Sequence, residues 1–306
     1  MPKAVLEGLK KYPVRITAVS AMLDSGGSAG RERREYQTGV AFGDFRRAAL
    51  ALADIKAKDK DMFAHRYQTG PLTGHVLANL YCSTVVLGRK IEKSIKELIE
   101  DIKEDLNISP KHQILPSTLD NSHLCAELEN GQIVIGEGNI DVPSHNGKLR
   151  IKNVFLTPQA KANPQALKEV AEADLLVLGP GDLYSSLAQI LLTEGMPQAV
   201  RKSRAKKVYL CNVMTKYGET NDFSVIDFAQ AVEKMLGTEL DRVVYNNSFP
   251  NKETVMKYKR KHKELIKPVS YSRKLPKKKF IGKNLLKRGI LEHDPQKVAK
   301  TLISFL

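Results

Sequence analysis

The sequence has only three cysteines and lacks any long apolar run. Cys82, Cys125 and Cys211 lie far apart and form no Cys-x-x-Cys pair, which argues against a disulfide framework and a zinc site and favours a reducing compartment. No apolar stretch reaches the roughly 18 residues that a transmembrane helix needs. The opening MPKAVLEGLKKYP has no apolar core or small-residue cleavage site of a secretory signal. We therefore expect a soluble cytoplasmic protein without membrane insertion.

Several catalytic signatures are also missing. The sequence has no Gly-x-Ser-x-Gly elbow, no Walker-type Gly-Lys-Ser/Thr and no His-Glu-x-x-His. These absences argue against ordinary hydrolases, P-loop enzymes and zinc proteases.

The positive charge is concentrated at one end of the chain. Residues 251–306 hold 17 Lys and Arg against 4 Asp and Glu, which is +13 of the net +15. The stretches KYKRKHK and RKLPKKKF, with Tyr258, Tyr271 and Phe280 interleaved, could contact RNA phosphates and stack on bases. A solvated basic face on a terminal subdomain is the alternative, and it is the one we favour. Nucleic acid is therefore not the expected partner.

Strand-like and helix-like segments alternate along the chain. Asn130-Gly131 between two strand-like runs is a strong hairpin signal, and the apolar positions of 91–106 fall on one helical face. This alternation predicts an α/β protein with a doubly wound, mostly parallel sheet and one inserted β-hairpin. We expect strands at 14–19, 151–158, 173–179, 206–210 and 241–247, and helices at 45–57, 73–88, 91–106, 163–173, 225–236 and 294–305.

Three glycine-rich or polar turns follow predicted strands. They are 24–28 (DSGGS), 179–182 (GPGD) and 212–215 (NVMT). Since ligands of such sheets bind beyond the carboxyl ends of the strands, the three turns should meet at one edge. Glycines admit close backbone approach, and free N–H groups at a helix start favour phosphate. Each turn alone can serve only to reverse the chain, but together they predict a binding site for an anion.

Charged and polar residues near these turns are candidates for ligand contact. Asp24 could hold a divalent metal that bridges phosphates, or could cap its own turn. Arg31 and Arg46 could clamp an anion bidentately, or could be solvated surface residues. His75 and Asn79, four apart on a predicted helix, share a face and are either ligand contacts or satisfied core residues.

These motifs resemble the YvcK/CofD family, which comprises gluconeogenesis factors and 2-phospho-L-lactate transferases. The resemblance covers nearly the whole chain in order, and extends to ILPST and the acidic hairpin. Its remaining parts are DSGGSAGR (24–31), Gly43-Asp44-Phe45-Arg46, Gly74-His75 with Asn79, ADLLVLGPGDLY (173–184), CNVMT (211–215) with GET (218–220), and HDPQK (293–297).

The resemblance implies a Rossmann-like core over a single domain, 1–306, in which 251–306 is a basic C-terminal segment of the same fold. The transferase branch uses magnesium and moves a phospholactyl group from a guanosine-diphosphate donor to a deazaflavin alcohol. The YvcK branch binds UDP-sugars and is linked to cell shape, envelope precursors and growth on gluconeogenic carbon. The Gly-Gly-Ser turn and Arg31 are closer to the YvcK branch.

Three departures from the family pattern bear on these expectations. The family's first strand and Gly-rich loop have no counterpart ahead of VLEGLKKYP, so we expect either a longer native protein or an impaired form. Its paired Asp is here Asp24-Ser25, which weakens a magnesium site. Its usual Ser after Gly-Pro-Gly is Asp182, which could restore the lost carboxylate; unchanged magnesium dependence in D182S would contradict this.

The sequence thus predicts a UDP-sugar-binding regulatory protein, with a magnesium-dependent CofD-like transferase and a basic RNA-binding protein as alternatives. Mg²⁺ would act together with the nucleotide diphosphate, and a homodimer is left open. Asp24 and Asp182 are the metal candidates. The ligand-binding candidates are Ser25, Gly26, Gly27, Ser28, Gly30, Arg31, Gly43, Asp44, Arg46, His75, Asn79, Gly179, Pro180, Gly181, Tyr184, Asn212, Met214 and Thr215.

Overall fold

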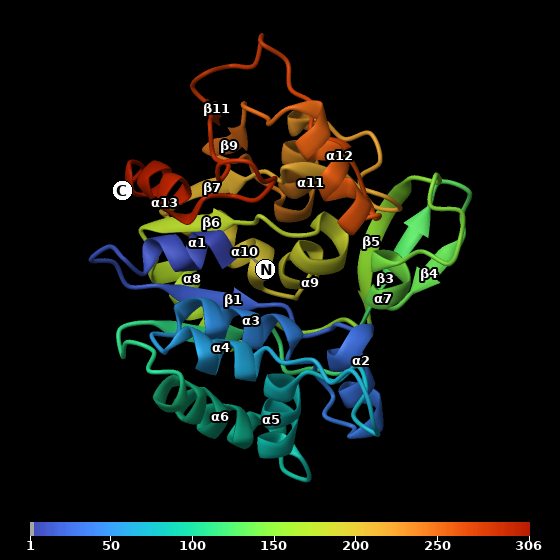
Figure 1. Cartoon of the computed structure of the whole chain (residues 1–306), viewed down its shortest axis with the longest axis vertical. Coiled ribbons are helices and arrows are strands. Elements are labelled where there is room, and N and C mark those ends of the chain that lie inside the picture. Colours follow the sequence, from blue (N-terminus) through green and yellow to red (C-terminus); the bar gives the residue numbers. More distant parts are fainter. Residues whose placement is uncertain (1–2) are drawn as a thin grey trace.

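Parallel strands form the centre of the molecule, as expected for an α/β fold. The computed structural model describes residues 3–306. Strand β1 (Thr17–Ser20) pairs in parallel with β2 (Gln113–Pro116). A second parallel sheet has the order β11-β9-β7-β6, and its strands span Leu175–Leu178 (β6), Lys206–Leu210 (β7), Arg242–Asn246 (β9) and Phe280–Lys283 (β11). The Rossmann-like α/β class is therefore confirmed, with the parallel strands divided between two sheets (Figure 1).

Helices surround both parallel sheets. On the side of β1 and β2 lie α3 (Gly43–Leu52), α4 (Ala57–Phe63), α5 (Leu77–Val86) and α6 (Ile91–Asp105) (Figure 1). The second sheet is accompanied by α8 (Pro164–Glu172), α10 (Met196–Lys202) and α11 (Val225–Leu236). Helix α1 (Lys3–Leu9) packs against α3 and against α13 (Pro295–Ile303). No helix within residues 3–306 is long and apolar enough to cross a membrane.

Several helix starts follow directly from the sequence. The Asn163 side chain accepts a hydrogen bond from the Gln165 N–H, with Pro164 in the first turn of α8. Asp294 accepts from two N–H groups at the start of α13, and Ser224 forms a capping box with Asp227 at α11. Such side chains satisfy N–H groups that the helix itself leaves without partners. The predicted caps of α8 and α13 are confirmed.

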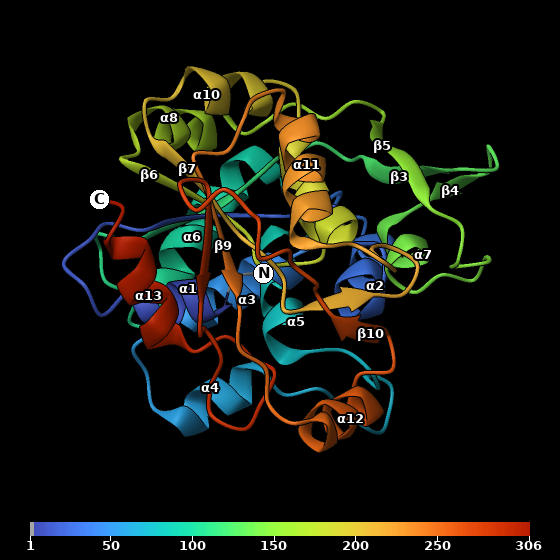
Figure 2. The ribbon, with the colours of Figure 1, turned by 90° about the horizontal axis from the view of Figure 1, so that it is seen from above.

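The predicted hairpin forms part of a separate antiparallel sheet. Strands β3 (His123–Leu128) and β4 (Ile133–Ile135) flank Asn130-Gly131, and β3 pairs on its other edge with β5 (Ile151–Thr157). Gly131 has φ of +85°, a value that this tight turn requires and that glycine adopts without strain. The short helix α7 (Glu137–Asp141) follows β4. Figure 2 shows this sheet at the side of the molecule opposite α13.

The basic C-terminal segment contributes to the parallel sheet. Strand β11 pairs with β9, and β10 (Leu265–Pro268) pairs antiparallel with β8 (Met214–Lys216). Helix α12 (Lys252–Lys261) has no buried side chain. Part of the positive charge therefore lies on a solvent-exposed helix, while the chain around it contributes to the fold.

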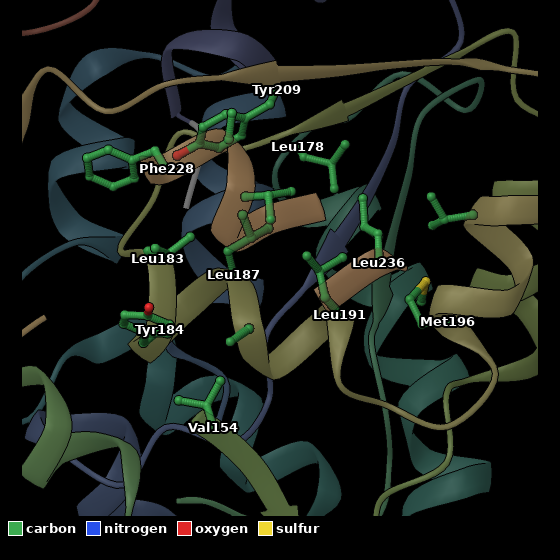
Figure 3. Close-up of a cluster of buried hydrophobic side chains, with 14 of the residues drawn as sticks. Val154, Leu178, Leu183, Tyr184, Leu187, Leu191, Met196, Tyr209, Phe228 and Leu236 are labelled. Atoms are coloured by element: carbon green, nitrogen blue, oxygen red, sulfur yellow. The ribbon is translucent and has the colours of Figure 1, made fainter. Parts of the chain in front are cut away.

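The apolar core forms two large clusters of buried side chains. One contains residues of α11, β3, β5 and the segment after β6, and Figure 3 shows Leu183, Leu187 and Leu191 gathered with Leu178 and Leu236. The other joins α1, α3, α6 and α13. The sequence periodicity of α6 is confirmed, since Ile95, Leu98 and Ile102 are buried while the opposite face is exposed.

Local structure differs from the sequence expectations in three places. The helix predicted at 73–88 begins only at Leu77, because Gly74 (φ +86°) interrupts the chain before it. The helix predicted at 45–57 ends at Leu52, since Ala53 is extended. After β6 the chain forms a π-helical turn, η1 (Leu183–Ala188), that continues into α9 (Gln189–Leu191); here the N–H groups of Tyr184 and Ser185 donate to Glu219.

Candidate functional site

The three turns predicted to meet at one sheet edge are linked by hydrogen bonds. The Asn212 side-chain amide donates to the Gly181 carbonyl at 2.8 Å, which ties the third turn to the second. Gln189 of α9 accepts from the Leu23 N–H and donates to Asp24, which ties the first turn to the helix that follows the second. The carboxyl ends of β1, β6 and β7 thus open onto one common edge.

The first turn is held by a close approach of backbone to backbone. A Cβ on Gly30 would lie 2.1 Å from the Ser25 carbonyl carbon, so no larger residue fits there without movement. Gly27 has φ of +54°, where L side chains are strained. Helix α2 (Gly27–Glu35) begins directly after Gly26. The sequence therefore needs glycine at 27 and 30 to place this helix start at the sheet edge.

Residues from elsewhere in the chain fix the same turn. The Glu137 carboxylate accepts from the Ser25 N–H at 3.1 Å, and the Ser25 hydroxyl accepts from the Gly138 N–H at 2.8 Å. The Arg34 guanidinium donates to the Ser25 carbonyl at 2.6 Å. Helix α7 and the turn therefore form one hydrogen-bonded unit. In it the Glu137 carboxylate accepts a hydrogen bond from one of the backbone N–H groups that we expected to bind phosphate.

Ser28, His75 and Asn79 lie in a buried polar network behind the turn. The Ser28 hydroxyl donates to Glu32 at 2.6 Å and accepts from Asn79 at 3.1 Å. His75 Nδ1 lies 3.0 Å from the same Glu32 carboxylate. His75 precedes α5, so the prediction that it shares a helix face with Asn79 is wrong. His75 nevertheless contacts Glu32 and Asn79 donates to Ser28, so both residues hold α2 from the interior.

Arg46 is buried without full hydrogen bonding. Its side chain is 8% exposed, and its Nε has no hydrogen-bond partner among residues 3–306. Burial, with Arg47 and Arg66 nearby, lowers the pKa of Arg46 to about 10. A buried donor without an acceptor costs free energy, so an anion bound here would recover it. Arg31, by contrast, is partly exposed and donates to the Thr73 carbonyl.

Buried carboxyl groups lie next to the first turn. Burial, followed by the charge of Asp44, raises the pKa of Asp24 to about 7. Burial, followed by the charge of Asp24, raises the pKa of Glu137 to about 8. Arg47 pairs with Asp44 at 2.8 Å and offsets part of this negative charge. A Cβ on Gly43 would lie 2.9 Å from Asp24, so glycine leaves room for this carboxylate.

The carboxylates near Asp24 fit a divalent cation. Carboxylate oxygens are the ligands that Mg²⁺ prefers, and it commonly binds through one or two of them together with phosphate. Asp24 and Asp44 can supply these oxygens, because the Asp24 carboxylate lies against Gly43, the residue directly before Asp44. Burial, and after it the charge of Asp44, raises the pKa of Asp24. A cation between them would relieve the repulsion between the two carboxylates.

Asp182 belongs to a different acidic cluster, which already contains a cation. The Lys216 ammonium contacts Asp141, and it lies 2.9 Å from both Asp182 and Glu219. Burial alone would lower the pKa of Lys216, but the three carboxylates together raise it, so it stays charged. The carboxylates of Asp141, Asp182 and Glu219 are close enough to hold a metal ion, and the ammonium group takes that role.

Some of the other predicted contact residues lie at the rim formed by the three turns, and the rest are buried in the core. Gly179 approaches β7 closely, since a Cβ there would lie 2.9 Å from the Leu210 carbonyl oxygen. Asn212 Oδ1 is buried without a hydrogen-bond partner among the described residues. Tyr184, Met214 and Thr215 are buried in the core or beneath the rim. The rim therefore consists of Asp24–Gly27, Gly179–Asp182 and Asn212.

The sequence interpretation assigned no role to Arg47, Glu137, Gln189, Lys216 and Glu219. Arg47 could have been found, because Asp44 and Arg47 are three apart on a helix and therefore adjacent. Glu137 and Gln189 lie 112 and 165 residues from their partners Ser25 and Asp24. No local pattern reports a contact over that distance.

Comparison with known proteins defines the class that this fold and site represent. A family model described as 2-phospho-L-lactate transferase CofD matches residues 3–286, and the chain belongs to this family. The predicted resemblance is thereby confirmed.

Individual relatives are gluconeogenesis factors. The chain is 35% identical over 312 residues to the gluconeogenesis factor of Bacillus subtilis (strain 168), with 99% of this chain and 94% of that protein covered. It is 34% identical over 307 residues to the gluconeogenesis factor of Halalkalibacterium halodurans, covering 98% and 91%. A crystal structure from Bacillus halodurans, described as a member of the upf0052 family, superposes with a TM-score of 0.87 at 32% identity, covering 98% and 96% of the two chains.

Proposed function

We propose that this chain binds a UDP-sugar or a related nucleoside diphosphate at the three-turn edge, and acts as a regulatory protein of the gluconeogenesis-factor type. The main support is a cavity of about 410 Å³ whose lining includes Pro180, Asn212, Lys287 and His293. This volume is in the range of small-molecule sites. Both Asn212 Oδ1 and His293 Nε2 are buried without hydrogen-bond partners among residues 3–306. Polar atoms of this kind suit the hydrogen-bonding edge of a nucleobase or sugar.

The diphosphate would lie on the side of the first turn. The start of α2 offers backbone N–H groups, and helix starts favour phosphate. Arg46 supplies a buried positive charge, and Asp24 with Asp44 can hold a magnesium ion between protein and phosphate. The names of the relatives support a regulatory role. Links to cell shape and envelope precursor supply form the wider part of this proposal.

Calorimetric titration with UDP-N-acetylglucosamine, with and without Mg²⁺, tests the proposal. We expect saturable binding that Mg²⁺ strengthens and that H293A weakens. N130A, on the distant hairpin turn, is the matched control and should bind as the parent chain does. Absence of binding under both conditions would contradict the UDP-sugar assignment.

A transferase function is the alternative that the family model favours. It requires a deazaflavin acceptor in addition to a guanosine-diphosphate donor. Magnesium-dependent binding of a deazaflavin alcohol, together with GDP in preference to UDP, would replace the regulatory proposal with this one.

A further inference from the structure

The first turn of the candidate site is already contacted by a carboxyl group of the protein itself. The Glu137 carboxylate accepts from the Ser25 N–H at 3.1 Å, and the backbone of Gly26 also hydrogen-bonds to this carboxylate. Successive backbone N–H groups that lie directly before a helix form a concave site for an anion. Glu137 therefore stands where a phosphate of the ligand would bind.

Helix α7 also covers the start of α2. A Cβ on Gly138 would lie 3.0 Å from the N and Cα atoms of Gly26, so the two backbones are in direct contact. The Ser25 hydroxyl accepts from the Gly138 N–H at 2.8 Å. Figures 1 and 2 both show α7 beside α2. A phosphate can reach the N–H groups of Ser25 and Gly26 only after this contact has opened.

The two ends of α7 are held in different ways. At the carboxyl end Ile140 is buried in the core cluster that contains residues of α11 and β3, and Asp141 contacts the Lys216 ammonium. At the amino end the chain enters through Gly136, which has φ of +93° and, as glycine, the freest backbone of any residue. Release of Glu137 therefore needs movement of the helix start alone, while the carboxyl end stays fixed.

The charge at this edge also disfavours a free anion. Asp24 belongs to the same turn, and burial, followed by the charge of Asp24, raises the pKa of Glu137. A phosphate that arrives alone adds negative charge beside these two acids, and like charges at close range repel. Departure of Glu137 removes one of the acids, and a magnesium ion at Asp24 would offset the charge of the phosphate. Exchange of carboxylate for phosphate therefore favours a magnesium-bound ligand.

We infer that Glu137 determines the specificity of the first turn, because its carboxylate is an internal competitor of the ligand's phosphate. Free phosphate or pyrophosphate has to displace this carboxylate with no other contact to the protein. A nucleoside diphosphate is held in addition by its nucleoside, in the cavity that Asn212 lines, and this raises the effective concentration of its phosphates at the turn. The first turn thus accepts phosphate only as part of a larger ligand. The inference rests on the proposed function, since it assigns this turn to the diphosphate.

Calorimetric titration with two probes, pyrophosphate and UDP-N-acetylglucosamine, each with Mg²⁺, tests the inference. Glu137→Ala removes the competitor, and Glu137→Gln keeps an acceptor for the Ser25 N–H but removes the negative charge. Glu129→Ala, at an exposed position of the hairpin, is the matched control. Circular dichroism and thermal unfolding check that each variant is folded.

We expect Glu137→Ala to bind pyrophosphate at least about tenfold more tightly than the parent chain, because a competitor lowers the apparent affinity by the fraction of molecules in which the turn is open. UDP-N-acetylglucosamine should also bind Glu137→Ala more tightly. Glu137→Gln should show a smaller gain, and Glu129→Ala none. If neither folded variant of Glu137 binds pyrophosphate more tightly than the parent chain does, the inference is overturned.

Amide hydrogen exchange of the parent chain with bound UDP-N-acetylglucosamine gives a second readout that needs no variant. Exchange at Gly138 should become faster, because its N–H loses the Ser25 hydroxyl, while the Ser25 amide stays protected by the phosphate. Slower exchange at both amides would mean that α7 closes over the ligand, and would overturn the inference. Failure of the parent chain to bind UDP-N-acetylglucosamine would contradict the proposed function alone, since the pyrophosphate comparison still decides whether Glu137 competes.

Discussion

At the scale of single residues, the site combines charges that are buried and incompletely compensated. Burial raises the pKa values of Asp24 and Glu137, and a neighbouring charge adds to each shift, that of Asp44 for Asp24 and that of Asp24 for Glu137. Arg46 has the opposite charge and a lowered pKa for the same main reason, burial. Natural proteins accept such costs where a ligand offsets them. Both kinds of charge are thus suited to a magnesium–phosphate unit.

The raised pKa of Asp24 predicts a pH-dependent effect of Asp24→Asn on stability. The Asp24 carboxyl has a pKa of about 7 in the folded protein, so between about pH 4 and pH 7 the folded state binds more protons than the unfolded state. The folded protein therefore loses stability as pH rises through this range. We expect Asp24→Asn to raise the free energy of unfolding relative to the parent by about 2 kcal/mol at pH 8 and by little at pH 4. Urea unfolding at both pH values measures this. An effect of equal size at the two pH values would contradict the assignment.

The buried guanidinium of Arg46 predicts that a substitution there weakens ligand binding without lowering the stability of the fold. Arg46→Met keeps most of the apolar volume and removes a charge whose Nε has no partner in the described chain. We expect stability to be unchanged or higher, and UDP-sugar affinity to fall by about tenfold or more, because a charge-assisted hydrogen bond is lost. Arg89→Met, at an exposed ion pair with Glu97, is the control. A lower free energy of unfolding for Arg46→Met, with unchanged affinity of the folded variant, would assign Arg46 a structural role.

At the scale of elements, the first turn is packed so closely against its neighbours that substitutions in it are expected to be poorly tolerated. The predicted helix α2 and its glycines are local features of the sequence, while the α7 contact to Ser25 is not. The caps, the hairpin and the face of α6 were predictable because each depends on residues within a few positions. The start of α5 was not, since it depends on the positive φ of Gly74, which the apolar pattern of the segment does not report.

Gly30→Ala tests this packing. The added methyl group would lie 2.1 Å from the Ser25 carbonyl carbon, so backbone must move, and we expect a loss of about 3 kcal/mol in the free energy of unfolding. Gly88→Ala is the matched control, with φ of +68° and open space around its Cβ, and should cost about 1 kcal/mol from backbone strain alone. Equal losses in urea unfolding would mean that the contact at Gly30 relaxes without cost.

At the scale of the whole molecule, segments that are far apart in the sequence build the core together. The two large core clusters each combine N-terminal, central and C-terminal segments. The fold class and the edge at which the three turns lie were predictable, because alternating strands and helices restrict topology strongly. The division of the parallel strands between two sheets was not, since it depends on which edges meet in space.

The C-terminal helix provides a test at this scale. Leu302 of α13 is fully buried in the cluster that also contains Val5 and Leu6 of α1. We expect Leu302→Ala to lower the free energy of unfolding by about 3 kcal/mol, and Lys300→Ala, on the exposed side of the same helix, to have little effect. A small loss at Leu302 would indicate that α13 is peripheral to the cooperative unit.

The ammonium group of Lys216 joins three segments that are remote in sequence, since Asp141, Asp182 and Glu219 all contact it. Asp182 stands where the family pattern has serine, and its partner lies 34 residues further along the chain. Loss of any one of these acids changes the net charge around the buried Lys216 ammonium, and so changes the environment of the two acids that remain. Substitutions at these four positions are therefore coupled. Exchange of Lys216 for a neutral residue leaves three acids, on three different segments of the chain, without their common cation, so the order in which such changes can accumulate is restricted.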